Sequence, residues 1–296
     1  MIDPPLPPLP LADRVLSLDG RGDPYAAYAK LGAETKAALL GLLPDGWSFA
    51  GKRVLDFGSG AGRTLRHFLV EAQTAEIWGA DIDAASIEWL QRSLCPPLHA
   101  TRCAPEPPLA VDPGFDLIWA ISVFTHLTDA SLPWLLELHR LLAPGGLLIA
   151  TYMGRWNSEL LAGEPWDEDR IGMNVLRHDQ GWDDGGPMVL MSDWWVCEHW
   201  GRAFEILDRR DVHGQTWALL RKRDVSLSAA DLERPSDDPR ELAALRHNVR
   251  QLQRELERRG DELRRAYEST RSWRLTAPLR RLSRSWPRPG SSRARP

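Results

Sequence analysis

The sequence predicts an α/β protein built on a doubly wound, mostly parallel sheet of seven strands. Between residues 21 and 223, short apolar runs that suit buried strands alternate with segments whose apolar residues recur at helical spacing. Such alternation is typical of a parallel sheet with crossover helices on both faces. Toward the end of this region, the runs 204–211 and 216–222 flank His213 and Gly214, which predicts an antiparallel hairpin.

The individual elements follow from apolar patterning and from capping residues. Asp23 followed by Pro24 is a favourable helix start, and Pro44 ends that helix near Leu43. Asp83 is placed to cap a later helix. Strands are expected at 53–55, 76–81, 98–102, 115–121 and 147–152, with helices at 24–43, directly after Gly62, at 84–94 and at 131–142. A further hairpin, with strands near 171–177 and 187–191, is expected in the tryptophan-rich segment.

Composition and charge narrow the class of protein. The chain of 296 residues carries a formal net charge of −4, which argues against a specific nucleic-acid binder. Its 3 cysteines lack paired spacing, so neither a disulfide framework nor a metal site is expected. No apolar run reaches the roughly 18 residues of a membrane span, and the proline-rich start lacks the apolar core of a signal peptide. A cytoplasmic protein is therefore expected.

The C-terminal part differs in composition from the α/β region. Its segment 242–267 carries a heptad pattern, which predicts a coiled coil that pairs with a second copy or with a partner helix. From Arg271 onward the chain holds eight arginines and no acidic residue, and such a tail favours an anionic membrane face. The predicted divisions are a flexible lead-in (1–20), the α/β domain (21–223) with an acceptor-side insertion (156–191), a linker (224–239), the coiled coil (240–268) and a basic tail (269–296).

Three glycines at alternate positions follow the first predicted strand. Gly58, Gly60 and Gly62 come directly after the run that ends near Asp56. Glycine permits a turn with unusual backbone angles, and it lets a ligand lie against the backbone where a Cβ would intrude. This strand–turn–helix order indicates a site for a nucleotide-type cofactor. The third glycine comes one residue too early for a dinucleotide fingerprint, and no Gly-Lys-Ser/Thr follows as in a P-loop.

Two acidic residues stand near the ends of the first two predicted strands. Asp56 ends a buried strand, where an unpaired carboxylate is costly, so we expect it to accept hydrogen bonds from loop N–H groups. Asp81 ends the next strand, and its carboxylate can accept two hydrogen bonds from a vicinal diol such as ribose. Asp81 could instead cap the following helix, but Asp83 is better placed for that role. Ile82 would then lie against the base of a nucleoside.

Four segments between residues 53 and 151 are informative through their order and spacing. They are Asp56 to Gly62, Gly79-Ala80-Asp81, Phe115-Asp116-Leu117-Ile118 followed by Ser122-Val123-Phe124-Thr125-His126-Leu127, and Leu141-Leu142-Ala143-Pro144-Gly145-Gly146. Together they resemble the core of class I S-adenosylmethionine (SAM) methyltransferases. The resemblance implies a Rossmann-like fold, SAM as cofactor, and transfer of its methyl group. It implies SAM contacts at Asp56, Gly58, Ser59, Gly60, Gly62, Asp81, Ile82 and Ser122, with the methionyl ammonium near Asp56.

One segment departs from that family's pattern. Members often place an acidic residue after the third strand for the adenine amino group, whereas this chain reads Cys103-Ala104-Pro105-Glu106. Backbone groups or Glu106 could take that role.

His126 and a group of tryptophans are candidates for handling the acceptor. His126 would follow the fourth strand, at the carboxyl edge where open α/β sheets bind ligands, and the pKa of a histidine suits a general base. The alternative is a histidine that holds its loop by bonding to the backbone. Tryptophans pack in cores by default or form a flat platform for a sugar. Those considered are Trp156, Trp166, Trp182, Trp194, Trp195 and Trp200.

Short stretches give a second, looser resemblance. The segment Ser122 to Leu127 and the tail Trp273 to Arg280 are similar to methyltransferases and glycosyltransferases of bacterial surface-polysaccharide clusters. This implies O-methylation of a glycan or related polar acceptor, with peripheral contact at the inner membrane face. Two other functions stay open. One is a non-catalytic protein that recruits partners through the coiled coil, and the other is an NAD-dependent oxidoreductase, which Arg63 and the Pro-Gly-Gly turn disfavour.

Overall fold

A computed structural model describes residues 4–13, 23–178, 180–181, 186–212 and 214–270. The chain divides into two compact units, Met1–Leu245 and Arg246–Pro296. The first unit is the α/β domain. The described part of the second unit continues the long helix α7 (Arg240–Ser269).

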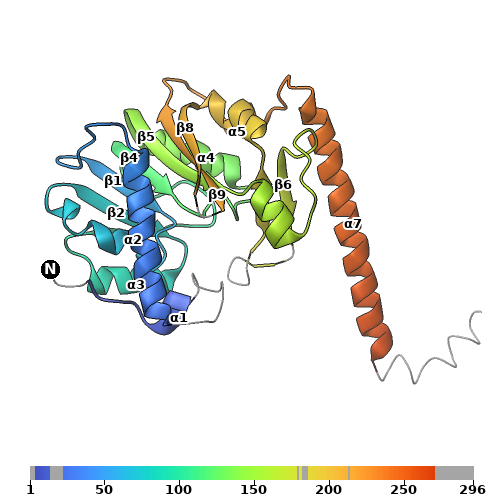
Figure 1. Cartoon of the computed structure of the whole chain (residues 1–296), viewed down its shortest axis with the longest axis horizontal. Coiled ribbons are helices and arrows are strands. Elements are labelled where there is room, and N and C mark those ends of the chain that lie inside the picture. The colour runs from blue at the N-terminus through green and yellow to red at the C-terminus, as the bar shows by residue number, and fades with distance from the viewer. Residues whose placement is uncertain (1–3, 14–22, 179, 182–185, 213, 271–296) are drawn as a thin grey trace, which may run out of the picture. The chain divides into compact units, whose positions relative to one another are not determined.

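A seven-stranded sheet forms the centre of the first unit (Figure 1). Its strand order is β3-β2-β1-β4-β5-β9-β8. The first five strands in this order run parallel to one another, and β9 runs antiparallel to both of its neighbours. The strands are β1 (Arg53–Phe57), β2 (Glu76–Asp81), β3 (His99–Arg102), β4 (Phe115–Ala120), β5 (Leu142–Tyr152), β8 (Phe204–Val212) and β9 (Gln215–Lys222). The predicted doubly wound sheet, closed by an antiparallel hairpin, is confirmed.

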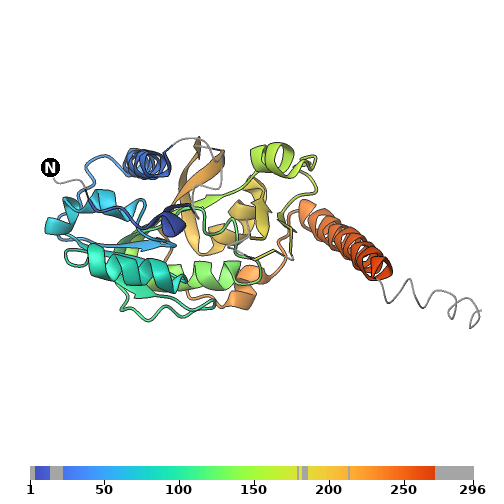
Figure 2. The same ribbon diagram turned by 90° about the horizontal axis from the view of Figure 1, so that it is seen from below.

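Each face of this sheet has its own apolar core. On one face α2 (Pro24–Leu42) and α3 (Ala84–Ser93) pack around Trp119. On the other face α4 (Ser131–Leu141) and α5 (Asp193–His199) pack around Trp200. Figure 2 shows α2, in blue, covering one side of the domain. Alternate strand residues enter opposite cores, which is why the buried strands read as continuous apolar runs.

The predicted helix after Gly62 is wrong. The chain forms only two short 3-10 turns there, η1 (Leu65–Phe68) and η2 (Glu71–Gln73). Leu65 and Phe68 are fully buried, and a spacing of three residues places them on one side of a 3-10 turn as well as of an α-helix. Without an α-helix behind the glycines, no macrodipole of useful length points at the loop. Binding at the loop must therefore rest on its N–H groups and on nearby side chains.

The N-terminal lead-in is partly structured. Helix α1 (Leu9–Asp13) buries Ala12, and Arg66 donates a hydrogen bond to the carbonyl oxygen of Pro4. The prediction of a flexible lead-in is therefore wrong for this part, while residues 14–20 lie outside the described residues. Asp23 caps α2 as predicted, since its Oδ1 accepts from Tyr25 N at 3.0 Å.

Two strand regions differ in detail from the prediction. Strand β5 begins at Leu142 rather than near residue 147, and its pairing with β4 shifts between Phe115 and Leu117. The Pro-Gly-Gly turn is thus an irregularity within the strand, with Gly145 at a φ of 71°. The predicted hairpin of the tryptophan-rich segment is present as β6 (Met173–Leu176) and β7 (Met188–Met191). A π-helical turn, η3 (Asn157–Ala162), precedes it.

The predicted linker 224–239 contains a helix and packs on the domain. Helix α6 (Ala229–Glu233) follows a capping box between Ser228 and Asp231, and its Leu232 is fully buried. Arg202, in the 3-10 turn η5 (Trp200–Arg202), donates through Nη1 to the carbonyl oxygens of Asp231, Leu232 and Arg234 at 2.6 to 3.1 Å. The serine, aspartate and proline residues of this segment are typical of a linker, which is why the sequence predicts one. In the structure, contacts from α5 and η5 hold the segment on the domain.

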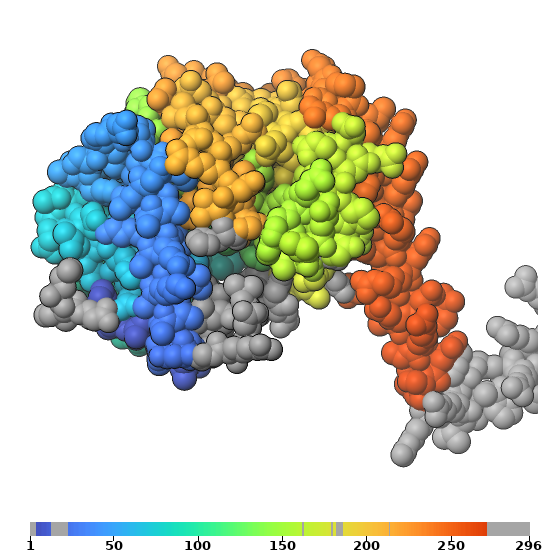
Figure 3. Space-filling view, viewed as in Figure 1, coloured from blue at the N-terminus to red at the C-terminus, as the bar shows by residue number. Residues whose placement is uncertain are grey.

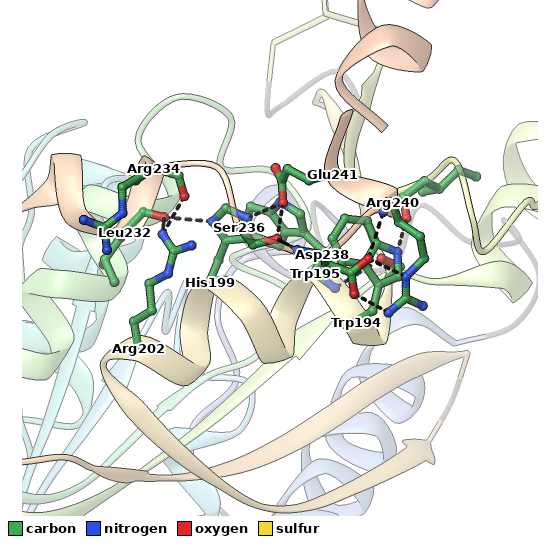
Figure 4. A network of polar contacts seen from close by, with 12 residues as sticks. Trp194, Trp195, His199, Arg202, Leu232, Arg234, Ser236, Asp238, Arg240 and Glu241 are labelled. Atoms are coloured by element: carbon green, nitrogen blue, oxygen red, sulfur yellow. Dashed lines mark hydrogen bonds and ion pairs between the residues drawn. The ribbon is translucent and has the colours of Figure 1, made fainter. Parts of the chain in front are cut away.

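Helix α7 begins inside the domain, in a network of polar contacts (Figure 4). His199 is 2 % exposed; its Nδ1 lies 2.8 Å from the carbonyl oxygen of Leu232 and its Nε2 lies 3.1 Å from Oε2 of Glu241. Ser236 Oγ donates to the same carboxylate oxygen at 2.9 Å. Both ring nitrogens thus face oxygen atoms, one of a backbone carbonyl and one of a carboxylate. The first turn of the predicted coiled coil therefore belongs to the domain.

The helix predicted over 240–268 is present, and its apolar residues are exposed. Leu256 and Leu263 have 67 % and 64 % of their surface exposed. Pairing of this helix stays a prediction, and the basic tail from residue 271 lies outside the described residues. Among the helices that the structure describes, none is long and apolar enough to cross a membrane.

Candidate active site

The glycine loop at the carboxyl end of β1 is held by backbone bonds to β2. The N–H groups of Gly58 and Ser59 both donate to the carbonyl oxygen of Ala80, at 2.8 and 3.1 Å. Gly58, Gly60 and Gly62 have φ values of 84°, 51° and 77°, in the left-handed region that glycine adopts without strain. The backbone of this turn therefore requires the alternate glycines that the sequence shows.

The three glycines face different surroundings. A Cβ on Gly58 would lie 2.2 Å from Cγ2 of Val123, and a Cβ on Gly62 would lie 2.6 Å from Cδ2 of Leu90. Within the described part of the chain, a Cβ on Gly60 would meet no atom within 4 Å. Neighbouring side chains thus explain why Gly58 and Gly62 must be glycine, and no ligand is needed for that explanation. The backbone of Gly60, by contrast, is accessible to a ligand.

Asp81 holds the glycine loop from the end of β2. Its Oδ2 accepts a hydrogen bond from Gly60 N at 2.6 Å, and its Oδ1 accepts one from Asp83 N at 2.8 Å. Asp83 caps α3 by accepting from Ser86 N at 3.1 Å, as the sequence predicts. Burial raises the pKa of Asp81. Because a carboxylate oxygen accepts more than one hydrogen bond, Asp81 keeps acceptor capacity beside Gly60.

Asp56 is the most deeply buried acid of the site, with 4 % of its surface exposed. Burial, with a smaller contribution from the charge of Asp81, raises its pKa to about 8, while Trp119 and Arg63 favour the ionised form. The indole N–H of Trp119 has no hydrogen-bond partner of normal geometry among the described residues, so its support for the charge is weak. Asp56 is therefore largely protonated at neutral pH until a cation approaches it.

Tyr28 of α2 covers the glycine loop. It is fully buried, and its hydroxyl donates to the carbonyl oxygen of Ala61 at 2.9 Å. Burial raises the pKa of Tyr28 above its usual range, so the hydroxyl remains a donor. Apolar periodicity places Tyr28 in the core. Its bond to a loop 33 residues further along the chain has no local signal in the sequence.

The chain leaves β4 through a strained residue. Ser122 has a φ of 59°, which is uncommon for a residue other than glycine. Its N–H donates to Thr151 Oγ1 at 2.7 Å, and Gln215 Nε2 donates to its Oγ at 3.0 Å. Strained backbone persists only where its surroundings hold it, and it clusters at functional sites. Thr151 and Gln215, which sequence reasoning missed, therefore position this edge.

His126 follows Ser122 on the same loop. Its Nδ1 lies 3.0 Å from the carbonyl oxygen of Pro187. A carbonyl can only accept, so Nδ1 carries the proton and Nε2 presents its lone pair. Burial lowers the pKa of His126, and the bond to Pro187 partly opposes this. His126 is thus a neutral histidine of fixed tautomer. The structure thus contains the bond to the backbone by which His126 could hold its loop. It also leaves Nε2 with the lone pair that a general base requires.

Comparison with known proteins identifies one domain of the chain. Residues 55–148 match a family model described as a methyltransferase domain, and this match includes most of β1, all of β2, β3 and β4, and most of β5. The chain contains a class I SAM-dependent methyltransferase domain. The protein is therefore an enzyme that uses SAM. No curated protein matches the methyltransferase in sequence.

A solved structure with a TM-score of 0.50 shares the fold of the methyltransferase. A SAM-dependent methyltransferase from Mesorhizobium loti is 14 % identical, with a TM-score of 0.50, and the match covers 63 % of this chain and 96 % of that one. A putative SAM-dependent methyltransferase from Listeria monocytogenes is also 14 % identical, with a TM-score of 0.48, over 65 % of this chain and 100 % of that one.

The residues of the methyltransferase fit SAM at the glycine loop. The open backbone at Gly60 leaves room where a ligand must approach closely, and Asp81 beside it has the acceptor oxygens that a ribose diol needs. The buried Asp56 suits a cationic group, because a cation restores the charge that burial suppresses. Half-buried Ile82 follows Asp81, and Arg102 Nε donates to its carbonyl oxygen at 3.2 Å.

A cavity of about 510 Å³ opens beyond the ends of β5 and β9. Trp156 and Trp166, from the tryptophan-rich segment, both line it. Its other lining residues are Gly154, Arg155, Asn157, Glu168, Met191, Asp193, Asp211, Gly214 and Thr216. In Figure 3 the yellow-green segment that leads into β6 lies beside the orange β8–β9 hairpin. The cavity is therefore at the carboxyl edge of the parallel strands.

Three of the remaining tryptophans do not line the cavity. Trp194, Trp195 and Trp200 are at most 6 % exposed and belong to the core beneath α5. Trp182 lies outside the described residues. These three tryptophans therefore pack in the core, whereas Trp156 and Trp166 line the cavity.

Proposed function

We propose that this methyltransferase O-methylates a glycan or a related polar acceptor. The observation that carries the proposal is the cavity beyond β5 and β9, which combines two indole rings with carboxylate and amide side chains. Indole rings offer flat apolar surface to the C–H face of a sugar, while carboxylates and amides accept and donate hydrogen bonds at its hydroxyls. A purely apolar acceptor would leave these polar groups desolvated without partners.

We assign the SAM contacts to the loop and to the two acids. Asp81 accepts hydrogen bonds from the ribose hydroxyls, Ile82 lies against the adenine, and ionised Asp56 faces the methionyl ammonium. Gly60 supplies the open backbone, with Gly58, Ser59 and Gly62 shaping the turn around it. Ser122 positions the loop at the methyl end. The adenine amino group is left to backbone groups near Cys103, whose N–H bonds to the backbone oxygen of Asp81 at 2.9 Å, or to the exposed Glu106.

His126 acts as the general base in this proposal. When bound, SAM supplies a methyl group on a sulfonium, so the acceptor oxygen forms the new O–CH3 bond as the S–CH3 bond breaks and S-adenosylhomocysteine leaves. The acceptor hydroxyl loses its proton to Nε2 of His126, which the bond from Nδ1 to Pro187 keeps unprotonated. The rest of the rate enhancement comes from alignment of acceptor and methyl group.

A His126→Ala variant tests the base. We expect turnover to fall on the order of 100-fold while SAM affinity stays nearly unchanged, as for a lost general base. Steady-state kinetics with calorimetric SAM titration separates the two quantities. If turnover stays within about threefold of wild type, well below the usual general-base contribution, His126 only holds its loop.

The acceptor class is tested by label transfer. The full chain is incubated with methyl-labelled SAM and extracts fractionated into carbohydrate, lipid, protein and nucleic acid. We expect label in the carbohydrate fraction, as a base-stable ether. The Asp81→Ala variant, which should weaken SAM binding by about 1 to 2 kcal/mol, serves as the control for enzyme-dependent transfer. Label confined to another fraction contradicts the glycan acceptor, and no transfer to any fraction favours the non-catalytic interpretation.

A further inference from the structure

The cavity beyond β5 and β9 carries more negative than positive charge. Three carboxylates line it, those of Glu168, Asp193 and Asp211, against one guanidinium, that of Arg155. Arg155 is engaged with Glu159, which is not among the lining residues, at 3.5 Å. A ligand that enters the cavity therefore meets a surplus of carboxylate oxygens.

Asp193 is the one lining acid with a cation of its own. Its Oδ1 accepts from Tyr152 Oη at 2.5 Å, and its Oδ2 lies 3.5 Å from Nη1 of Arg209. Asp193 begins α5, whereas its partners Tyr152 and Arg209 lie on β5 and β8. The charge of Asp193 is therefore largely balanced within the domain.

Glu168 and Asp211 are held by neutral donors. Trp166 Nε1 donates to Glu168 Oε2 at 2.7 Å, and Thr216 Oγ1 donates to Asp211 Oδ1 at 2.7 Å. Neither carboxylate forms an ion pair in the part of the chain that the structure describes. The charge of Glu168 contributes to raising the pKa of Arg240. Arg240, however, donates to the carboxylate of Asp238, from Nε to Oδ1 at 2.9 Å and from Nη2 to Oδ2 at 2.7 Å. Glu168 and Asp211 each keep a second carboxylate oxygen for a ligand.

Trp156 provides an aromatic surface at the same cavity. Its side chain is 48 % exposed although it is the largest residue type. It packs against Gly214 in the β8–β9 turn, so closely that a Cβ on Gly214 would lie 2.8 Å from two of its ring carbons. The turn therefore fixes the indole in place while leaving much of it accessible. An indole face attracts cations as well as sugar C–H groups.

We propose that this cavity selects a glycan acceptor that carries a protonated amine, such as an amino sugar. The ammonium is held by Glu168 and Asp211 with the indole of Trp156 beside it, and the sugar hydroxyls use the remaining polar groups. This inference rests on the proposed glycan acceptor and narrows it. A neutral glycan would leave two carboxylates without a cation, and an acidic glycan would meet like charge.

Three oligosaccharides that differ only at C2 test the preference. They are tetramers of glucosamine, of N-acetylglucosamine and of glucose, all β-1,4-linked, which present an ammonium, an acetamide and a hydroxyl. Binding to the full chain in mildly acidic buffer is followed by calorimetry and by tryptophan fluorescence. We expect the glucosamine tetramer to bind roughly tenfold or more tightly than the other two, with an advantage that falls as salt rises.

Variants locate this preference in the cavity. Glu168→Gln and Asp211→Asn should each reduce the advantage of the glucosamine tetramer severalfold, and Trp156→Ala should weaken all three tetramers. Glu205→Gln is the matched control, since it makes the same change of charge at an exposed residue that pairs with Arg221 on the hairpin, outside the cavity lining. Unchanged SAM affinity shows that each variant is folded.

The outcomes separate this inference from the proposed function. Equal binding of the three tetramers, no binding of any, or an advantage that survives in both acid variants overturns amine selection. The glycan acceptor itself still stands in those cases if label passes from SAM to the carbohydrate fraction. Absence of label there overturns the proposed function, whichever tetramer binds.

Discussion

Two of the three glycines in the loop between β1 and η1 are each confined by a different neighbouring side chain. Val123 confines Gly58 and Leu90 confines Gly62, whereas Gly60 borders open space in the described part of the chain. Gly62 is therefore needed for packing of the folded turn, whereas Gly60 is available to a ligand. Substitutions at the two positions can measure these two requirements separately.

Gly60→Ala and Gly62→Ala form a matched pair. Both positions have positive φ, so alanine costs each folded state about 1 to 2 kcal/mol. Gly62→Ala also overlaps Leu90, and overpacking costs roughly 1 to 3 kcal/mol more. We expect Gly62→Ala to lower the free energy of unfolding more, and Gly60→Ala to lower SAM affinity more. Denaturant unfolding and calorimetry measure the two; equal losses of SAM affinity in folded variants would contradict the open face at Gly60.

Asp56 should make the stability of the SAM-free protein depend on pH. Its pKa is raised to about 8 in the folded state, so between about pH 4 and about pH 8 the folded chain holds a proton that the unfolded chain releases. The free energy of unfolding therefore falls as pH rises through this range. Asp56→Asn removes the titrating group and with it this loss.

Denaturant unfolding of wild type and Asp56→Asn at about pH 5 and about pH 8 checks this expectation. The difference in unfolding free energy should shift in favour of the variant at the higher pH. A difference that does not change with pH would show that Asp56 is ionised throughout in the folded protein.

The central strands β1, β4 and β5 could be predicted because each contains a short apolar run bounded by turn residues. The same reasoning misplaced the segment after Gly62, where the spacing of Leu65 and Phe68 suits a 3-10 turn as well as an α-helix. Helix α6 was missed because it is held by distant residues. The carbonyl oxygen of Leu232 contacts Arg202 and His199, which lie 30 and 33 residues earlier in the chain. Local sequence contains no trace of such partners.

The candidate site divides in the same way. The positive φ of Gly60 and the helix cap at Asp83 could be predicted because they depend on backbone conformation and on contacts within a few residues. Tyr28 and Gln215 could not, because their side chains reach loops 33 and 93 residues away in the chain. The acidic cavity combines three separate segments and had only the excess of tryptophan as a signal.

The contact between α5 and the start of α7 is open to a direct test of stability. Glu241→Ala would leave Nε2 of the buried His199 without its hydrogen-bond partner, and an unsatisfied buried polar group costs about 1 to 3 kcal/mol, to which the lost packing of the Glu241 side chain adds. Ser236→Ala removes only a neutral donor to the same oxygen and should cost about 1 kcal/mol. Denaturant unfolding compares the two, and equal small losses would mean that the pair contributes little.

The boundary between the two units falls within α7, after Leu245 rather than in the predicted linker. A chain cut at the predicted boundary would lose Glu241 and Ala244, which are 6 % and 3 % exposed, from the domain core. The stripe of apolar residues beyond the boundary is exposed, and an isolated helix of this kind is only marginally stable in water.

Truncation after Leu245 should therefore separate association from catalysis. We expect residues 1–245 to keep the unfolding temperature and SAM affinity of the full chain, and to lose a modest self-association through the heptad residues. Light scattering over a range of concentrations measures the association. A full chain that is monomeric throughout would refute pairing with a second copy, and residues 1–239 should unfold at a lower temperature than either.

The loop after β4 and the strand that follows the tryptophan-rich segment are joined at two points. Val189 N donates to the carbonyl oxygen of Thr125 at 2.8 Å, next to the contact between His126 and Pro187. Thr125 is fully buried, so the Val189 amide can exchange its hydrogen with solvent deuterium only when this joint opens. The exchange rate of that one amide thus reports how often the acceptor side parts from the histidine loop, and a bound acceptor that spans both should slow it.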